Sequence, residues 1–102
     1  MKRLIVYFHY DLLGQIDTAC RVAVEAMAHY GEVFFISNGT LRPADRAWAA
    51  SVTLTCRERE NKGLDVGAYK EALAVIGRGR LARYDELVLM NFTLAGPVCS
   101  PA

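Results

Sequence analysis

The stretch that decides the fold is Leu4-Ile-Val-Tyr-Phe8, an unbroken run of apolar, β-branched and aromatic side chains. A strand with one face in water alternates apolar and polar residues. A run that is apolar at every position is typical of a strand buried on both faces of a parallel sheet. Outward from this run, strand-like and helix-like patterns alternate. The further strands are expected at residues 32–36, 51–56 and 86–90, and the helices at residues 17–30, 43–50 and 64–76.

Several residues mark where these elements begin and end. Asp17 is expected to be the N-cap of the first helix, because its carboxylate can accept from the free N–H groups of the first turn. Gly31 is expected to stop that helix, and Gly77 and Gly79 to stop the third. Residues 57–62 are expected to form a polar loop.

The element order β-α-β-α-β-α-β has connections long enough for helical crossovers, which implies parallel strands covered by helices. Right-handed crossovers favour a Rossmann-like topology. The sequence therefore predicts an α/β fold, a Rossmann-like three-layer half-domain with a mostly parallel four-stranded sheet and helices on both faces. The 102 residues fit one domain.

The composition argues against several classes of partner. The net charge is +1, so neither nucleic acid nor an anionic membrane is expected, since both need a clustered basic face. No apolar run approaches the ~20 residues of a membrane span. The run after the initial Met-Lys-Arg has no cleavage site, which favours a first strand over a signal peptide. The three cysteines form no Cys-x-x-Cys pair, so neither a disulfide framework nor a zinc site is supported, and a cytoplasmic location is expected.

Arg78, Arg80 and Arg83 form a local concentration of basic charge. We expect these arginines on a solvated turn. The alternative is that they lie near the phosphate of a bound ligand.

Polar residues follow each of the four expected strands. In an open parallel sheet, ligands bind beyond the carboxyl ends of the strands, at the point where the strand order reverses. We therefore expect these loops to share one edge and to form a binding site. The candidates are Tyr10 and Asp11 after the first strand, Asn38 after the second, Asn61, Lys62, Gly63 and Asp65 after the third, and Asn91 after the fourth.

The candidates on the first two loops also have structural interpretations. Tyr10 and Asp11 suit stacking on and hydrogen bonding to a nucleoside, yet a turn-forming Asp is equally ordinary. Asn38 can bind a base or ribose, or simply belong to an Asn-Gly-Thr turn. His9 has no partners for a catalytic triad and is expected to be structural.

The loop before the third helix has two interpretations as well. Gly63 can adopt a positive φ, Lys62 adds a charge, and the helix N-terminus offers N–H donors to a phosphate. Alternatively, Asn61 or Asp65 caps the helix and Gly67 permits close packing of helix on sheet. The loop matches neither a Walker sequence nor a Gly-x-Gly-x-x-Gly fingerprint.

Four segments, in the same order and spacing, resemble the rhamnan synthesis F family. The matching segments are Tyr7-Phe-His-Tyr-Asp11, Phe35-Ile-Ser-Asn38, Glu60-Asn-Lys-Gly-Leu-Asp-Val-Gly-Ala-Tyr-Lys70, and Tyr84-Asp-Glu-Leu-Val-Leu-Met-Asn91 with Gly96-Pro97. The third segment is fairly specific and the others are weak alone. The resemblance implies a glycosyltransferase-like A-type fold and a role in bacterial cell-surface polysaccharide synthesis.

The resemblance also implies a ligand. It implies a nucleotide-sugar donor, a dTDP- or UDP-sugar such as dTDP-rhamnose, and a glycan acceptor. Asp11 and Asn38 would face the nucleoside. The diphosphate and sugar side would be shaped by Asn61, Gly63, Asp65 and Tyr69. No catalytic residue is assigned, and hexosyl or deoxyhexosyl transfer is expected only if the chain is active.

One departure from the family pattern concerns metal binding. Asn91 occupies the place where such folds hold a metal-binding acidic motif. Asn-Asp-Ser is expected there, but the sequence has Asn91-Phe92-Thr93. A divalent cation prefers carboxylate oxygen and Phe92 offers none, so no metal ligand is assigned and a donor-bound Mg²⁺ or Mn²⁺ is not expected to be held here.

The last expected strand is apolar on both faces, like an interior strand, and only residues 94–102 remain after its loop. An uncovered apolar strand is prone to association. We therefore expect the domain to be incomplete as a catalyst, with this edge covered by a second copy in a homo-oligomer such as a dimer, or by a missing C-terminal region. The alternative function is a non-enzymatic binding or assembly module. A flavodoxin-like or response-regulator-like domain is disfavoured because no acidic pair or phosphate loop follows the first strand.

Overall fold

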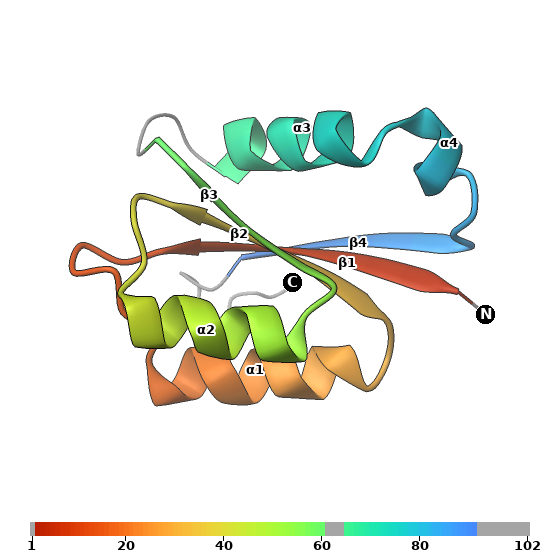
Figure 1. Ribbon diagram of the computed structural model, residues 1–102. Coiled ribbons are helices and arrows are strands. Elements are labelled where there is room, and N and C mark those ends of the chain that lie inside the picture. Colours follow the sequence, from red (N-terminus) through yellow and green to blue (C-terminus); the bar gives the residue numbers. More distant parts are fainter. Residues whose placement is uncertain (1, 61–64, 92–102) are drawn as a thin grey trace.

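The computed structural model describes residues 2–60 and 65–91, with Asp65 described by its backbone alone. Its strands and helices alternate along the chain as the sequence predicts (Figure 1). In chain order they are β1 (Arg3–Tyr10), α1 (Thr18–Ala28), β2 (Glu32–Asn38), α2 (Pro43–Val52), β3 (Thr55–Arg59), α3 (Asp65–Ile76), α4 (Arg78–Leu81) and β4 (Glu86–Asn91).

The four strands form one sheet in the order β3-β2-β1-β4, and every neighbouring pair is parallel. Helices α1 and α2 cover one face of the sheet, while α3 and α4 lie on the other (Figure 1). The predicted fold, a three-layer α/β arrangement around a parallel sheet, is confirmed.

Strand β1 lies in the middle of the sheet, which explains why residues 4–8 are apolar at every position. Ile5 and Tyr7 belong to the core under α1 and α2, whereas Leu4, Val6 and Phe8 belong to the core under α3. All five side chains are almost fully buried. Burying both faces of one strand is what joins the two cores into a single structure.

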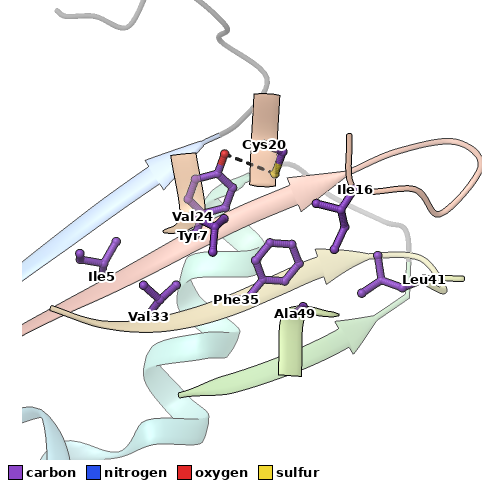
Figure 2. Packing of buried hydrophobic residues seen from close by; sticks show 9 residues of the cluster. All are labelled: Ile5, Tyr7, Ile16, Cys20, Val24, Val33, Phe35, Leu41 and Ala49. Atoms are coloured by element: carbon purple, nitrogen blue, oxygen red, sulfur yellow. Dashed lines mark hydrogen bonds between the residues drawn. The ribbon is translucent and has the colours of Figure 1, made fainter. Parts of the chain in front are cut away.

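The core under α1 and α2 is built around two stacked rings, Tyr7 and Phe35, whose centroids are 5.8 Å apart (Figure 2). The Cys20 thiol lies 3.5 Å from the Tyr7 hydroxyl oxygen. Burial raises the pKa of Cys20 to about 11 and raises that of Tyr7 as well. Both groups therefore stay protonated at neutral pH, and Cys20 is a core residue with no thiolate for chemistry.

The predicted third strand at residues 51–56 is wrong. Helix α2 continues to Val52, and Thr53 closes it by donating its backbone N–H and its hydroxyl to the Ala49 carbonyl at 3.0 and 2.7 Å. Strand β3 begins only at Thr55 and takes in residues 57–59, which were expected in a loop. The alternation of residues 51–56 also fits the last helical turn, and an edge strand tolerates the charged sequence that follows.

The ends of two helices also differ from expectation. Asp17 is the N-cap of α1, accepting from the Cys20 N–H at 2.8 Å, as predicted. However, α1 ends at Ala28, and Gly31 has an ordinary φ. Glycine is needed at position 31 because a Cβ would lie 2.6 Å from the Arg3 carbonyl oxygen. Residues 78–81, expected to be a turn, form the short helix α4.

Strand β4 has the apolar sequence of an interior strand but lies at an edge of the described sheet, as expected from the lack of a later strand. Val88 and Met90 pack on the core under α1 and α2. Leu87 and Leu89 face the other side of the sheet and are 43% and 46% exposed. Over residues 2–60 and 65–91, no helix has both the length and the apolar character required to cross a bilayer.

Candidate functional site

The strand order creates one reversal point. From β1 the chain moves outward through β2 to β3, then crosses to the other side of β1 to form β4. The helices on the two sides of this point lie on opposite faces of the sheet, because β1 leads to α1 on one face and the chain reaches β4 through α3 and α4 on the other. In sheets of this kind ligands bind outside the carboxyl edge at such a reversal point.

Three of the predicted site residues lie on this edge and on the same face of the sheet. Tyr10 on β1 is paired with Asn38 on β2. Asn91 on β4 is paired with Phe8, which lies two residues before Tyr10 on β1. Because side chains alternate along a strand, all of them share the α3 face with Phe8. The parallel sheet thus gathers Tyr10, Asn38 and Asn91 into one region.

Asn38 is held by a residue that the sequence analysis assigned to a loop. Arg59, its ladder partner on β3, donates from Nη1 to Asn38 Oδ1 at 2.8 Å. The Arg59 guanidinium also donates from Nε to Glu71 Oε1 on α3 at 3.1 Å, and Arg57 donates to the other Glu71 oxygen at 2.8 Å. The hydrogen bond from Arg57, with the second from Arg59, holds the pKa of Glu71 below its usual value.

This chain of contacts fixes the orientation of the Asn38 amide. Its oxygen is occupied by Arg59, whereas its Nδ2 donates to no residue in the described part of the chain. The alternating Arg-Glu-Arg sequence of residues 57–59, typical of a charged edge strand, was the signal that could have identified Arg59 in advance.

Tyr69 connects α3 to the end of β4. Its hydroxyl donates to the Met90 carbonyl at 2.7 Å, and its ring meets the Phe8 ring edge-on at 6.4 Å. Met90 immediately precedes Asn91, so Tyr69 lies beside the carboxyl end of β4. The structure therefore brings the predicted Tyr69 to the same region as Asn91.

Asp11 has the turn-forming role that was the alternative to ligand binding. Its Oδ2 accepts from the backbone N–H groups of Leu13 and Gln15 at 2.9 and 3.0 Å. Its other carboxylate oxygen accepts from no residue that the structure describes. Asp11 thus shapes the loop after β1 and retains one oxygen at its surface.

His9 has a structural role, as the sequence predicts for this position. Its Nε2 lies 2.9 Å from the Gln15 carbonyl, which can only accept, so Nε2 carries the proton. Nδ1 then accepts from the Ser37 hydroxyl at 2.8 Å. Burial lowers the pKa of His9, which favours the neutral ring with its proton on Nε2. His9 thereby ties the loop after β1 to β2.

A partly buried ion pair supports the same loop from the α1 and α2 side. Asp45 Oδ1 accepts from the Ile16 N–H at 3.1 Å and from the Arg21 guanidinium at 2.6 Å. Arg21 also lies over the Trp48 ring at 4.7 Å. Burial by itself raises the pKa of Asp45, but the contacts from Ile16 and Arg21 outweigh it and hold that pKa below its usual value.

The remaining predicted residues lie outside the described part of the chain. They are Asn61, Lys62, Gly63, the side chain of Asp65, and Phe92 with Thr93. Their roles stay predictions. Gly67 faces the Arg59 guanidinium, because a Cβ built on it would lie 3.4 Å from Nη2. A separation of 3.4 Å is an ordinary van der Waals contact. At Gly67, α3 therefore packs against the Arg59 side chain, which lies between the helix and the sheet.

The donor set available for a metal ion is weak in the described residues. Within residues 2–60 and 65–91, no group of three His, Cys, Asp or Glu side chains could hold a cation. At the end of β4 Asn91 supplies only an amide oxygen, a weaker ligand for Mg²⁺ or Mn²⁺ than carboxylate. The described residues therefore do not fit a dedicated metal site.

The parallel sheet, the reversal of its strand order and the polar side chains on one face define a class: a Rossmann-like α/β protein with a candidate ligand site at the carboxyl edge. The chain belongs to the family Rhamnan synthesis protein F, whose profile matches residues 33–101. It is thereby related to rhamnan synthesis, a form of polysaccharide biosynthesis. No curated protein and no solved structure matches the chain.

Proposed function

We propose that this chain is a nucleotide-sugar-binding domain of the glycosyltransferase type, acting in polysaccharide synthesis. The observation that carries the proposal is the placement of Tyr10, Asn38 and Asn91 on one face of the carboxyl edge, beside the reversal point, in a member of a rhamnan synthesis family. Ligands of this fold class bind at that point.

The contacts support a division of roles within the site. The Tyr10 ring is the surface on which a nucleoside base would stack, and the Asn38 Nδ2 would donate to base or ribose because Arg59 already occupies its oxygen. Asn91, with Tyr69 beside it, would contact the diphosphate and sugar end of the donor. Arg59 acts as a positioning residue, since its guanidinium orients Asn38.

The chemistry proposed for the donor is transfer of its sugar to a glycan acceptor. No step is assigned to a metal ion, because the described residues do not fit one. No catalytic residue is assigned either. In this proposal the domain binds and orients the donor, and a partner or a further region supplies the acceptor site.

Donor binding can be tested with one isosteric change. Asn38→Asp keeps the oxygen that Arg59 holds but replaces the Nδ2 donor by a negative oxygen. We expect it to weaken binding of dTDP- and UDP-sugars by about tenfold or more, because a lost donor and a new repulsion to the diphosphate are together worth about 1.4 kcal/mol or more. Calorimetric titration measures this, with and without Mg²⁺ or Mn²⁺.

Gln15→Glu is the matched control, because it makes the same chemical change at an exposed position of the neighbouring loop. It should leave binding within about twofold, since exposed charges are screened. Equal losses in both variants, or no binding of either nucleotide sugar at millimolar concentration, would count against the proposed function.

A second candidate function is favoured by the exposed leucines of β4. Leu87 and Leu89 lie on an edge strand whose outer backbone groups have no ladder partner within the described sheet. Such an edge suits an assembly module that pairs with a second copy of the chain. The oligomeric state separates this function from donor binding.

A further inference from the structure

A small cavity lies at the opposite end of the sheet from the proposed donor site, where the strands begin. It is open to solvent on one side and has a volume of about 160 Å³. Its lining residues lie in α4, just after α4, and at the amino ends of β1, β2 and β3. The lining residues are Lys2, Glu32, Leu54, Arg80, Arg83 and Tyr84.

The cations of this cavity differ from most other arginines of the chain. Elsewhere in the described residues, Arg42 and Arg78 also form no ion pair, but five arginines are matched to carboxylates; the pairs are Arg3–Glu86, Arg21–Asp45, Arg46–Glu58, and Arg57 and Arg59 with Glu71. By contrast, Lys2, Arg80 and Arg83 form no ion pair with any carboxylate of the described residues. Three uncompensated cations thus meet around one cavity.

The single carboxylate in the wall is already engaged. Glu32 Oε1 accepts from the Tyr84 hydroxyl at 2.5 Å. Burial, together with Glu32, raises the pKa of Tyr84, so this hydroxyl keeps its proton and continues to donate. Lys2 holds its ammonium over the Tyr84 ring at 5.1 Å. The formal charge of the lining is three cations against one anion, a net +2.

We propose that this cavity, lined by Lys2, Arg80 and Arg83, is a phosphate-binding site separate from the donor site. A phosphate dianion carries two charges and several acceptor oxygens, whereas a carboxylate carries one charge and two oxygens. Two guanidinium groups and an ammonium group therefore match a phosphate better than a single carboxylate. The volume holds about five waters at ~30 Å³ each, comparable with the five heavy atoms of a phosphate group. Leu54, 46% exposed at the rim, provides an apolar contact for the organic part of a phosphate ester.

The proposal identifies a phosphate group, which a soluble phosphate ester or a lipid headgroup could carry. The primary probe is therefore inorganic phosphate, titrated into the full chain and followed by backbone amide shifts in NMR at low ionic strength. We expect one saturable site whose shifts concentrate at residues 2, 32 and 80–84. Shifts centred on residues 10, 38 and 91 instead would overturn the proposal and would point to the carboxyl edge.

The variants isolate the two guanidinium groups. Arg80→Gln with Arg83→Gln should weaken phosphate binding by about tenfold or more, because hydrogen bonds to charged groups are the strong ones. Arg78→Gln is the matched control, since Arg78 is exposed on the same helix but does not line the cavity. It should change the affinity by less than about twofold, because Arg78 would not contact the bound phosphate and would act only through a charge screened by solvent. Equal weakening by both changes would mean diffuse attraction and no site.

Two further titrations distinguish the source of the phosphate. Vesicles of phosphatidic acid in phosphatidylcholine present the group on a lipid, and glycerol phosphate presents it in solution. If the vesicles or glycerol phosphate bind the wild-type chain and Arg78→Gln but not the double variant, the result supports the site. The probe that binds then identifies the kind of molecule that carries the phosphate. Binding of either that survives the double variant contradicts the proposal. None of these probes contains a nucleoside. A failure of the phosphate site therefore leaves the donor-site proposal intact, and a failure of nucleotide-sugar binding leaves the phosphate-site proposal intact.

Discussion

At the scale of single residues, the loop after β1 is held by buried polar groups on one side of the sheet. Asp45 and Arg21 anchor Ile16, and His9 anchors Gln15. Each of these groups forms hydrogen bonds within the described chain, where no buried side-chain nitrogen or oxygen lacks a partner. Polar groups that are buried and paired specify one loop conformation, because any other conformation would leave them unsatisfied.

Asp45→Asn should destabilise the protein by about 1–2 kcal/mol at neutral pH, since it removes one charge of a largely buried pair. The folded state lowers the pKa of Asp45, so its contribution is present above the pKa of the unfolded chain, about 3.9, and is lost as the pH falls further. Urea unfolding at pH 7 and in acid measures the difference. Glu25→Gln, on an exposed position of α1, should show no such difference; a wild-type advantage over Asp45→Asn that persists undiminished in acid would contradict the assignment.

His9 should make the free energy of unfolding depend on pH in a second range, higher than the range of Asp45. Burial lowers its folded pKa, so below the unfolded value of about 6.5 the unfolded chain binds a proton that the folded one does not. The free energy of unfolding should therefore fall as the pH drops below that value. In His9→Phe this slope should disappear, and the protein should lose about 1–3 kcal/mol because Ser37 and the Gln15 carbonyl lose their partner. An unchanged slope in this variant would show that His9 is not its source.

At the scale of elements, the loops on the carboxyl edge pack against each other through backbone. Gly14 has a φ of +73° and its carbonyl accepts from the Arg42 N–H at 2.9 Å. A Cβ at Gly14 would lie 2.3 Å from the Thr40 carbonyl oxygen. The loops after β1 and β2 therefore approach as closely as glycine allows, which sets the position of Asp11 relative to Asn38.

Gly14→Ala should accordingly cost about 2–3 kcal/mol or more, from the strained φ and the backbone clash. Gly79→Ala is the matched control. It lies in α4 with open space around the added methyl group, so it should be neutral or stabilising by up to about 1 kcal/mol. Thermal unfolding of both variants decides the matter; equal stability of the two would refute the close approach of the loops.

The elements also show where sequence patterns were sufficient. The long apolar run of β1, the cap at Asp17 and the periodicity of α3 were recognisable because each is a local pattern. The boundary between α2 and β3 was not, because residues 51–54 suit a helix end as well as a strand start. Only pairing with β2 decided that the strand would begin at Thr55 and bring Arg59 beside Asn38.

At the scale of the whole molecule, β4 is the element least covered by the described chain. Its outer edge has no ladder partner there, and the side chains of Leu87 and Leu89 are 43% and 46% exposed. Exposed apolar side chains on an open edge favour association.

Sedimentation velocity across a range of concentrations should therefore show self-association of the wild-type chain. Leu89→Lys should shift the equilibrium toward monomer and change the free energy of unfolding by no more than about 0.5 kcal/mol, as is usual at exposed positions. Thr18→Lys, at an exposed site on α1, is the control for added charge. A wild-type chain that is monomeric at every concentration would rule out the assembly function.

The sequence by itself determined the class of fold, the parallel sheet and the candidates on its carboxyl edge, because hydrophobic periodicity and element order are encoded locally and parallel strands must end on one side. Only the tertiary structure decided that Arg59 holds Asn38, that Asp11 is used within its own turn, and that Lys2, Arg80 and Arg83 meet around one cavity. These contacts join residues far apart in the chain. Their geometry depends on strand register and helix placement, which the balance of burial over the whole molecule sets.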